Sequence, residues 1–289
     1  MTDRLTETEN WVRTTALDRR AAIAGSVAAT TYALAAQPVE AAIRTPATGL
    51  DAAMVKFPAS GGFAMNAYRA RPAGKQNLPV VLVVQEVFGV HEWIKDITRR
   101  FARAGYYAIA PDLFARQGDP TKVADIGQLV STIVAKVPDA QVMADLDALI
   151  RFAGRDGGNA AKVGVTGFCW GGRATWLYAA HNPRIKAGVA WYGRLTSKPT
   201  ALQPTVPLDL VQRINVPVLG LYGGKDRGIP VEDVNAMNAA LAKARKPATI
   251  KLYPEADHGF LADYRPSYNA EAAKDGWAQA MGWFGKYLR

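Results

Sequence analysis

The chain of 289 residues is poor in cysteine and histidine, with Cys169 as its only cysteine and three histidines in all. A single cysteine excludes any disulfide within the chain, so the fold must depend on a packed core. No group of His, Cys and carboxylate residues has the spacing of a metal site. The sequence therefore predicts no metal and no cofactor.

Blocks of like charge are also absent. The formal net charge is +10, but the Lys and Arg residues are scattered along the chain. We find no zinc-finger spacing, no aromatic RNA-binding motif and no basic heptad array. We therefore interpret the excess of Lys and Arg as a property of a solvated protein surface, and we expect no nucleic-acid partner.

No apolar run is long enough for a stable membrane span. Near the N-terminus, Arg19-Arg20 precede an uncharged, alanine-rich stretch at residues 21–36, and Val39-Glu40-Ala41 offers a small-residue cleavage site. This order is typical of a twin-arginine export signal, although Asp18 stands where Ser or Thr is usual.

We therefore expect residues 1–41 to be such a signal and the protein to be periplasmic. The alternative is a flexible N-terminal arm on a cytoplasmic protein. Residues 50–289 are expected to form one domain. The sequence does not predict an oligomeric state.

Strands and helices alternate after residue 50. A short N-terminal antiparallel hairpin is predicted from strands at 54–57 and 63–69. Further strands are predicted at 80–84, 106–110, 162–166, 187–191, 218–222 and 249–253, and helices at 94–104, 121–137, 139–153, 173–180, 231–244 and 271–287. This alternation predicts an α/β fold with a mostly parallel sheet and helices on both faces. The irregular loop 194–215 is expected to border a pocket.

The stretch Gly167-Phe168-Cys169-Trp170-Gly171-Gly172 follows a predicted strand and precedes a predicted helix. Strand, Gly-x-nucleophile-x-Gly and helix together are the pattern of a nucleophile elbow. The small residues allow the sharp turn, and the helix N-terminus favours a thiolate at Cys169. A buried, inert cysteine is the alternative.

A cysteine nucleophile needs a base and a residue that orients the base. His258 follows the strand predicted at 249–253, and Asp226 ends the Gly-Gly-Lys-Asp loop after the strand at 218–222. Carboxyl ends of parallel strands meet at one edge of a sheet, which would bring these loops together. We predict His258 as the base and Asp226 as the orienting carboxylate. Asp257 is the weaker alternative.

These residues resemble the dienelactone hydrolase family of the α/β-hydrolase fold, from about residue 55 to the C-terminus. The resemblance depends on five motifs in order: Val84-Gln85-Glu86-Val87-Phe88-Gly89-Val90, Ala110-Pro111-Asp112-Leu113-Phe114-Ala115-Arg116, Gly167-Phe168-Cys169-Trp170-Gly171-Gly172, Gly223-Gly224-Lys225-Asp226 and Asp257-His258-Gly259-Phe260. It implies an α/β-hydrolase fold and a Cys-His-Asp triad.

The resemblance implies three further roles. Glu86 would lie beside the thiol and take part in its activation, which agrees with the effect of a carboxylate on a neighbouring thiolate. A structural salt bridge, for instance with Arg116, is the alternative for Glu86. The backbone N–H groups of Val87 and Trp170 would form the oxyanion hole.

One departure from the family concerns the arginines that hold a substrate carboxylate. Ala262 occupies one such position, and residues 117–140 contain no arginine. Arg265 or Arg173 could take over this role. Phe88, Trp191 and Tyr192 could add an aromatic lining for the substrate, with core packing as the alternative.

The sequence therefore predicts a single-domain hydrolase that cleaves a small ester or lactone through Cys169, His258 and Asp226, with a thioester intermediate. A glutaminase of the amidotransferase type and a non-catalytic binding protein of the same fold remain the alternatives.

Overall fold

The computed structural model describes residues 45–288, so the export signal expected at residues 1–41 lies outside the described residues. An eight-stranded sheet has the order β1-β2-β4-β3-β5-β6-β7-β8. Its strands are β1 Leu50–Pro58, β2 Ala64–Pro72, β3 Leu78–Val84, β4 Tyr107–Pro111, β5 Gly158–Phe168, β6 Ala187–Trp191, β7 Val218–Gly223 and β8 Ala248–Tyr253. β1 and β2 form the antiparallel hairpin, β2 pairs antiparallel with β4, and all other neighbours are parallel. The predicted α/β fold is confirmed.

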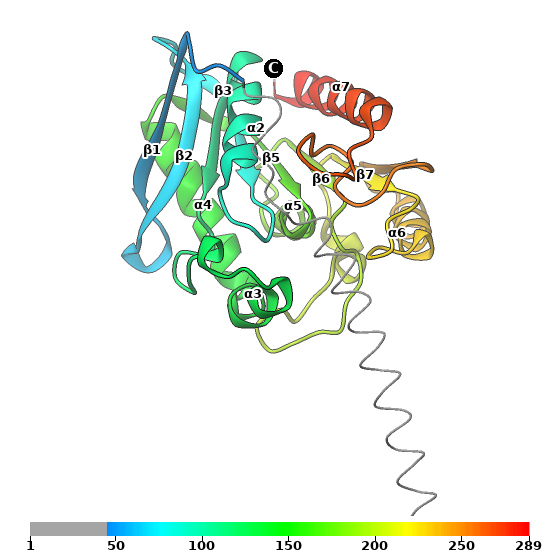
Figure 1. Cartoon of the computed structure of the whole chain (residues 1–289). Helices are drawn as coiled ribbons and strands as arrows, with labels where there is room; N and C mark the ends of the chain where they lie inside the picture. The colour runs from blue at the N-terminus through cyan, green and yellow to red at the C-terminus, as the bar shows by residue number, and fades with distance from the viewer. Residues whose placement is uncertain (1–44, 289) are drawn as a thin grey trace, which may run out of the picture.

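Helices cover both faces of the sheet (Figure 1). They are α2 Glu92–Arg103, α3 Ile126–Thr132, α4 Asp139–Arg155, α5 Trp170–His181, α6 Val231–Lys243 and α7 Ala270–Tyr287. On one face α2 packs against α7, with the Phe101 ring 4.8 Å from Trp277 and 5.8 Å from Phe284. On the other face α4 and α5 contact each other and β5. The all-apolar run of β3, Val80–Val84, is fully buried between these layers, as expected of a central strand.

The prediction of a single helix at residues 121–137 is wrong. This segment forms the short helix α3 between two 3-10 turns, at Pro120–Lys122 and Val134–Lys136. Asp125 caps α3 by accepting a 2.7 Å hydrogen bond from the Gln128 N–H, which fixes the start of the helix. Apolar periodicity alone did not show these interruptions. The result is a compact lobe that lies beside the carboxyl ends of the strands (Figure 1).

The remaining predicted elements are present within a few residues of their expected ends. The 194–215 segment contains one 3-10 helix at Pro207–Arg213. None of the described helices combines the length and the apolarity needed to cross a lipid bilayer.

Candidate active site

Cys169 lies in a sharp turn between β5 and α5. Its backbone is at φ 56° and ψ −114°, a conformation that is strained for any residue with a side chain. A Cβ atom at Gly167 would lie 2.1 Å from the Gly171 carbonyl oxygen, and one at Gly171 would lie 2.4 Å from that of Val84. Glycine is therefore required at both positions. The turn holds the Cys169 thiol at the carboxyl edge of the sheet, at the N-terminus of α5.

His258 and Asp226 come from the loops after β8 and β7. His258 Nδ1 lies 2.7 Å from Asp226 Oδ2, and both side chains are buried. The other carboxylate oxygen of Asp226 accepts a hydrogen bond from the Gly228 N–H at 2.8 Å, which fixes the carboxylate. Asp257, the alternative partner, instead accepts from the backbone N–H of His258 at 2.6 Å. The imidazole is therefore oriented by Asp226.

The charge of His258 depends on both of its neighbours. Burial alone would lower the pKa of the imidazole, but the Asp226 carboxylate and the Cys169 thiol outweigh burial and raise it from 6.5 to about 10. A hydrogen bond between Cys169 and His258 contributes to this increase. The thiol therefore lies close to the imidazole.

Glu86 is completely buried, and three donors converge on one of its oxygens. Oε2 lies 2.8 Å from Arg265 Nη2, 3.0 Å from the Tyr264 hydroxyl and 3.1 Å from His91 Nε2. Burial raises the pKa of this carboxyl, but Arg265 and then His91 outweigh burial and lower it to about 2. Glu86 is therefore ionised at neutral pH. Its other oxygen, Oε1, has no hydrogen-bond partner among residues 45–288.

The ion pair considered between Glu86 and Arg116 is not formed. Arg116 instead binds Asp145, with Nη1 2.5 Å from Oδ2 and Nη2 3.0 Å from Oδ1. The partner of Glu86 is Arg265, which comes from the loop after His258. A structural salt bridge on Glu86 is thus present, but with a different arginine from a distant part of the chain.

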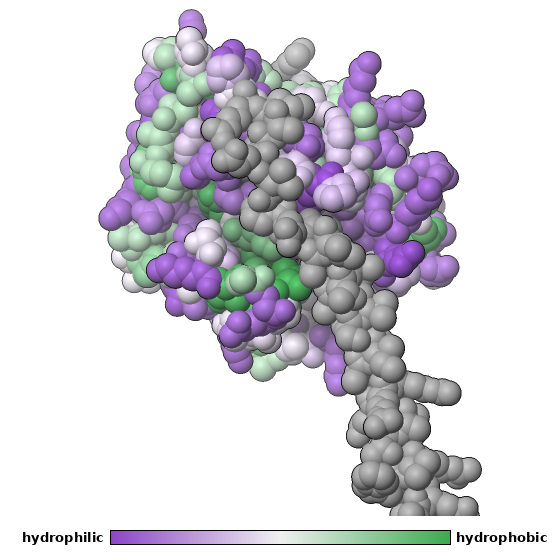
Figure 2. Space-filling view, viewed as in Figure 1, coloured by the Kyte–Doolittle hydropathy of each residue, from purple (hydrophilic) through white to green (hydrophobic). Residues whose placement is uncertain are grey.

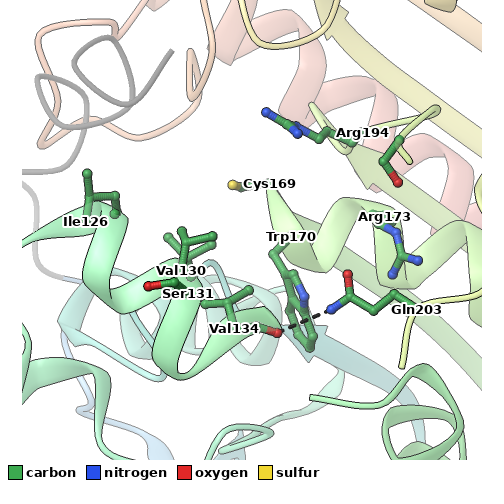
Figure 3. A pocket seen from close by; sticks show the side chains of 12 residues that line it. Ile126, Val130, Ser131, Val134, Cys169, Trp170, Arg173, Arg194 and Gln203 are labelled. Atoms are coloured by element: carbon green, nitrogen blue, oxygen red, sulfur yellow. Dashed lines mark hydrogen bonds between the residues drawn. The ribbon is translucent and has the colours of Figure 1, made fainter. Parts of the chain in front are cut away.

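A pocket of about 330 Å³ opens above the thiol (Figure 3). Val87, Cys169 and Trp170 line it together, and the oxyanion hole of the Val87 and Trp170 amides stays a prediction. Ile126, Val130 and Val134 form an apolar wall from α3 and the turn after it. The opposite wall comes from the 194–215 loop, whose Gln203 Nε2 donates to the Val134 carbonyl at 3.2 Å. This hydrogen bond joins the two walls.

Apolar side chains continue from the pocket to the surface. Val130 and Leu202 are each 38% exposed, although both are large hydrophobic residues. In Figure 2 hydrophobic side chains gather in the lower part of this face, where Figure 1 places α3. The entrance to the pocket is therefore mainly apolar on this side.

The two arginines proposed for a substrate carboxylate are both engaged in ion pairs. Arg173 lines the pocket, but its Nη1 and Nη2 bind the two oxygens of Asp139 at 2.7 and 2.8 Å. Arg265 is 6% exposed and binds Glu86. Arg194, which the sequence did not single out, is exposed, lines the pocket and makes no ion pair within the described part of the chain.

The predicted aromatic residues have different surroundings. Trp191 is fully buried, packs between Phe168 and Phe260, and donates from Nε1 to the Thr166 hydroxyl at 3.2 Å. Phe88 is partly buried, and its ring lies 5.4 Å from the Arg265 guanidinium. Tyr192 is fully buried against His258, with ring centroids 5.1 Å apart. Of these three rings, Tyr192 is the one that packs against His258.

Sequence reasoning missed His91 and Tyr264, which hold Glu86, and the apolar wall from α3. His91 lies five residues after Glu86, so its position in the same loop was an available signal. For Tyr264 there was no such local signal. In the described range 45–288 no group of three or more His, Cys, Asp or Glu side chains is arranged to hold a metal ion.

Comparison with known proteins identifies the family of the chain. A sequence model described as the dienelactone hydrolase family matches residues 65–288. A protein of Methylorubrum extorquens, provisionally named carboxymethylenebutenolidase, is 55% identical over 276 residues, or 94% of each chain. A protein of Escherichia coli K12 with the same provisional name is 52% identical over 258 residues, which cover 89% of this chain and 95% of the other.

A crystal structure of a provisionally assigned dienelactone hydrolase from Klebsiella pneumoniae is also similar. Its TM-score is 0.81 at 53% identity, and the alignment covers 82% of this chain and 99% of the other. The family model and the first relatives span most of the chain, so the similarity is not confined to the elbow motif. The chain therefore belongs to the dienelactone hydrolase family and is a hydrolase of that type.

Proposed function

We propose that the protein hydrolyses a small ester or lactone through a thioester on Cys169. The observation that carries this proposal is the position of Cys169, which lines the pocket while His258, held by Asp226, lies beside its thiol. The names of the two bacterial relatives, each a carboxymethylenebutenolidase, support a lactone as the substrate class.

In the first half of the reaction the Cys169 sulfur attacks the substrate carbonyl carbon. His258 holds the proton given up by the thiol, in agreement with its raised pKa, and the carbonyl oxygen becomes an oxyanion that accepts from the Val87 and Trp170 amides. Collapse of this intermediate breaks the bond to the leaving oxygen, which takes the proton from His258. The product of this half is the thioester and a free hydroxyl group. In a lactone that hydroxyl remains attached to the acyl chain.

In the second half a water molecule attacks the thioester carbonyl. His258 accepts a proton from the water and returns it to the Cys169 sulfur as the thioester bond breaks. The carboxylic acid leaves and the thiol is restored. Glu86 is proposed to assist thiol activation when its contacts with Arg265, His91 and Tyr264 are disturbed by substrate.

The decisive experiment is trapping of the thioester. The protein is mixed with activated esters and lactones, quenched in acid and analysed by mass spectrometry. We expect the acyl mass on the peptide that carries Cys169, and its release by hydroxylamine. The matched control is Cys169→Ala, which should show neither adduct nor turnover. Hydrolysis without any adduct, and undiminished in Cys169→Ala, would contradict the proposal.

A further inference from the structure

The Tyr192 hydroxyl is buried without a partner. Tyr192 is 0% exposed, and its oxygen has no hydrogen-bond partner among the described residues. Other buried tyrosines of this protein have one: Tyr107 donates to Asp156 at 2.8 Å, and Tyr222 donates to the Gly193 carbonyl at 3.0 Å. Burying an unpaired hydroxyl costs stability. The unpaired hydroxyl of Tyr192 therefore does not stabilise the fold, and we look for its role in the function of the site.

The backbone at Tyr192 is also strained. Its φ is 36°, and among the described non-glycine residues Cys169, at 56°, is the only other one that directly follows a strand with a positive φ. The two lie at the ends of neighbouring strands, β5 and β6, and the Cys169 N–H donates to the Trp191 carbonyl at 3.0 Å. The Tyr192 N–H donates to Leu221 at 2.8 Å, which holds the strained conformation. Strain of this kind accumulates at functional sites.

The ring of Tyr192 is held against the triad. It lies edge-on to His258 with centroids 5.1 Å apart, and 5.5 Å from the ring of Phe260. Burial, followed by the negative charge of Glu86, raises the pKa of the Tyr192 hydroxyl well above 10, and Cys169 also contributes. The hydroxyl therefore stays protonated and is available as a donor on a ring that packs against His258.

We propose that Tyr192 is a further catalytic residue, whose hydroxyl donates a hydrogen bond to the Cys169 sulfur when that sulfur carries negative charge. A neutral thiol is a weak hydrogen-bond acceptor, whereas a thiolate is a strong one. An interaction that forms only in the charged state lowers the barrier to reaction without tightening the resting state. The proton stays on Tyr192 throughout. This inference rests on the proposed function of Cys169.

The test is Tyr192→Phe, which removes the oxygen and keeps the ring. Cys169 is the only cysteine, so its alkylation by iodoacetamide can be followed without interference at pH values from 5 to 10. Tyr192→Phe should lose a hydrogen bond to the charged sulfur. At pH values below the midpoint of the curve of alkylation rate against pH, alkylation should therefore be slower by about tenfold or more, and that midpoint should move to higher pH. kcat/KM for ester hydrolysis should fall by a similar factor. Tm should stay the same or rise, because the unpaired hydroxyl is gone.

The matched control is Tyr107→Phe, at the opposite end of the sheet. It removes a hydroxyl that has a partner, so Tm should fall while alkylation and kcat/KM stay unchanged. A Tyr192→Phe protein with the alkylation profile and kcat/KM of wild type would overturn the proposal, and so would a loss of activity with an unchanged profile. If wild-type Cys169 itself neither alkylates nor forms a thioester, the proposed function fails, which is a separate result.

Discussion

Arg265 Nη2 lies 2.8 Å from Glu86 Oε2, although 179 residues separate the two along the chain. Arg265 is 6% exposed and Glu86 is fully buried, so each is the compensating charge for the other. The contact holds the carboxylate through one of its oxygens and leaves the other without a hydrogen-bond partner among the described residues. Arg265 is therefore not free to hold a substrate carboxylate while this pair is intact.

Replacement of Cys169 by alanine should abolish ester hydrolysis. We expect a loss on the order of 10³-fold or more in kcat, because nucleophile and base act as a unit. Circular dichroism and Tm measurements should show an intact fold. Cys169→Ser should keep some activity, since the base and the oxyanion donors remain. Near wild-type turnover in the alanine variant would remove Cys169 from the mechanism.

The Glu86–Arg265 pair should stabilise the fold in a pH window set by Glu86. The pKa of this carboxyl falls from 4.5 to about 2 on folding, so its contribution is present above pH 4.5 and is lost as the pH falls through about 2. One pKa unit corresponds to about 1.4 kcal/mol, so the lowered pKa of Glu86 contributes about 3 kcal/mol to the free energy of unfolding. Urea unfolding at pH values from 6 down to 2 measures it.

The control for this pH dependence removes both charges, because a single replacement would leave the other charge buried and unpaired. Glu86→Gln combined with Arg265→Met should show a shallower fall in the free energy of unfolding below pH 4.5 than wild type. Parallel curves for the two proteins would mean that the pair contributes nothing to acid stability.

The Asp226–His258 contact should have the opposite pH dependence. The pKa of His258 rises from 6.5 to about 10 on folding, so its contribution is complete below pH 6.5 and is lost as the pH rises through about 10. Asp226→Asn should therefore be less stable than wild type, by on the order of 3 kcal/mol at pH 6, with the difference shrinking towards pH 10. A difference that stays constant from pH 6 to pH 10 would exclude this coupling.

Neutral activated esters or lactones should be hydrolysed better than a carboxylate-bearing dienelactone. Ala262, buried in this structure, offers no charge, and Arg173 and Arg265 are held by Asp139 and Glu86. A buried carboxylate without a charged partner costs several kcal/mol. Comparison of kcat/KM for the two substrate types measures the preference.

Arg194 provides the control for this substrate preference. It is exposed, and an exposed ion pair contributes about 0–1 kcal/mol, so Arg194→Ala should change kcat/KM for a carboxylate substrate by less than about fivefold. A strong preference for the carboxylate substrate that is lost in Arg194→Ala would show that this arginine holds the carboxylate.

Structural elements whose causes are local could be predicted from the order of the amino acids. The elbow at Cys169 could be predicted because Gly167 and Gly171 meet a steric demand that no other residue meets. The parallel sheet followed from buried apolar strands between helices, and parallel strands bring the loops of Asp226 and His258 to one edge. These inferences need only chain order and short-range geometry.

Which charges form ion pairs, and which buried polar atoms have no partner, depends on the folded arrangement of distant segments. Arg116 pairs with Asp145, Arg173 with Asp139 and Arg265 with Glu86, and the last pair lies 179 residues apart. The sequence fixes the charge of each side chain, but pairing in a buried site depends on distances and desolvation that exist only once the chain is folded. The unpaired hydroxyl of Tyr192 is likewise a property of the packed site, since the same residue on a surface would be hydrated.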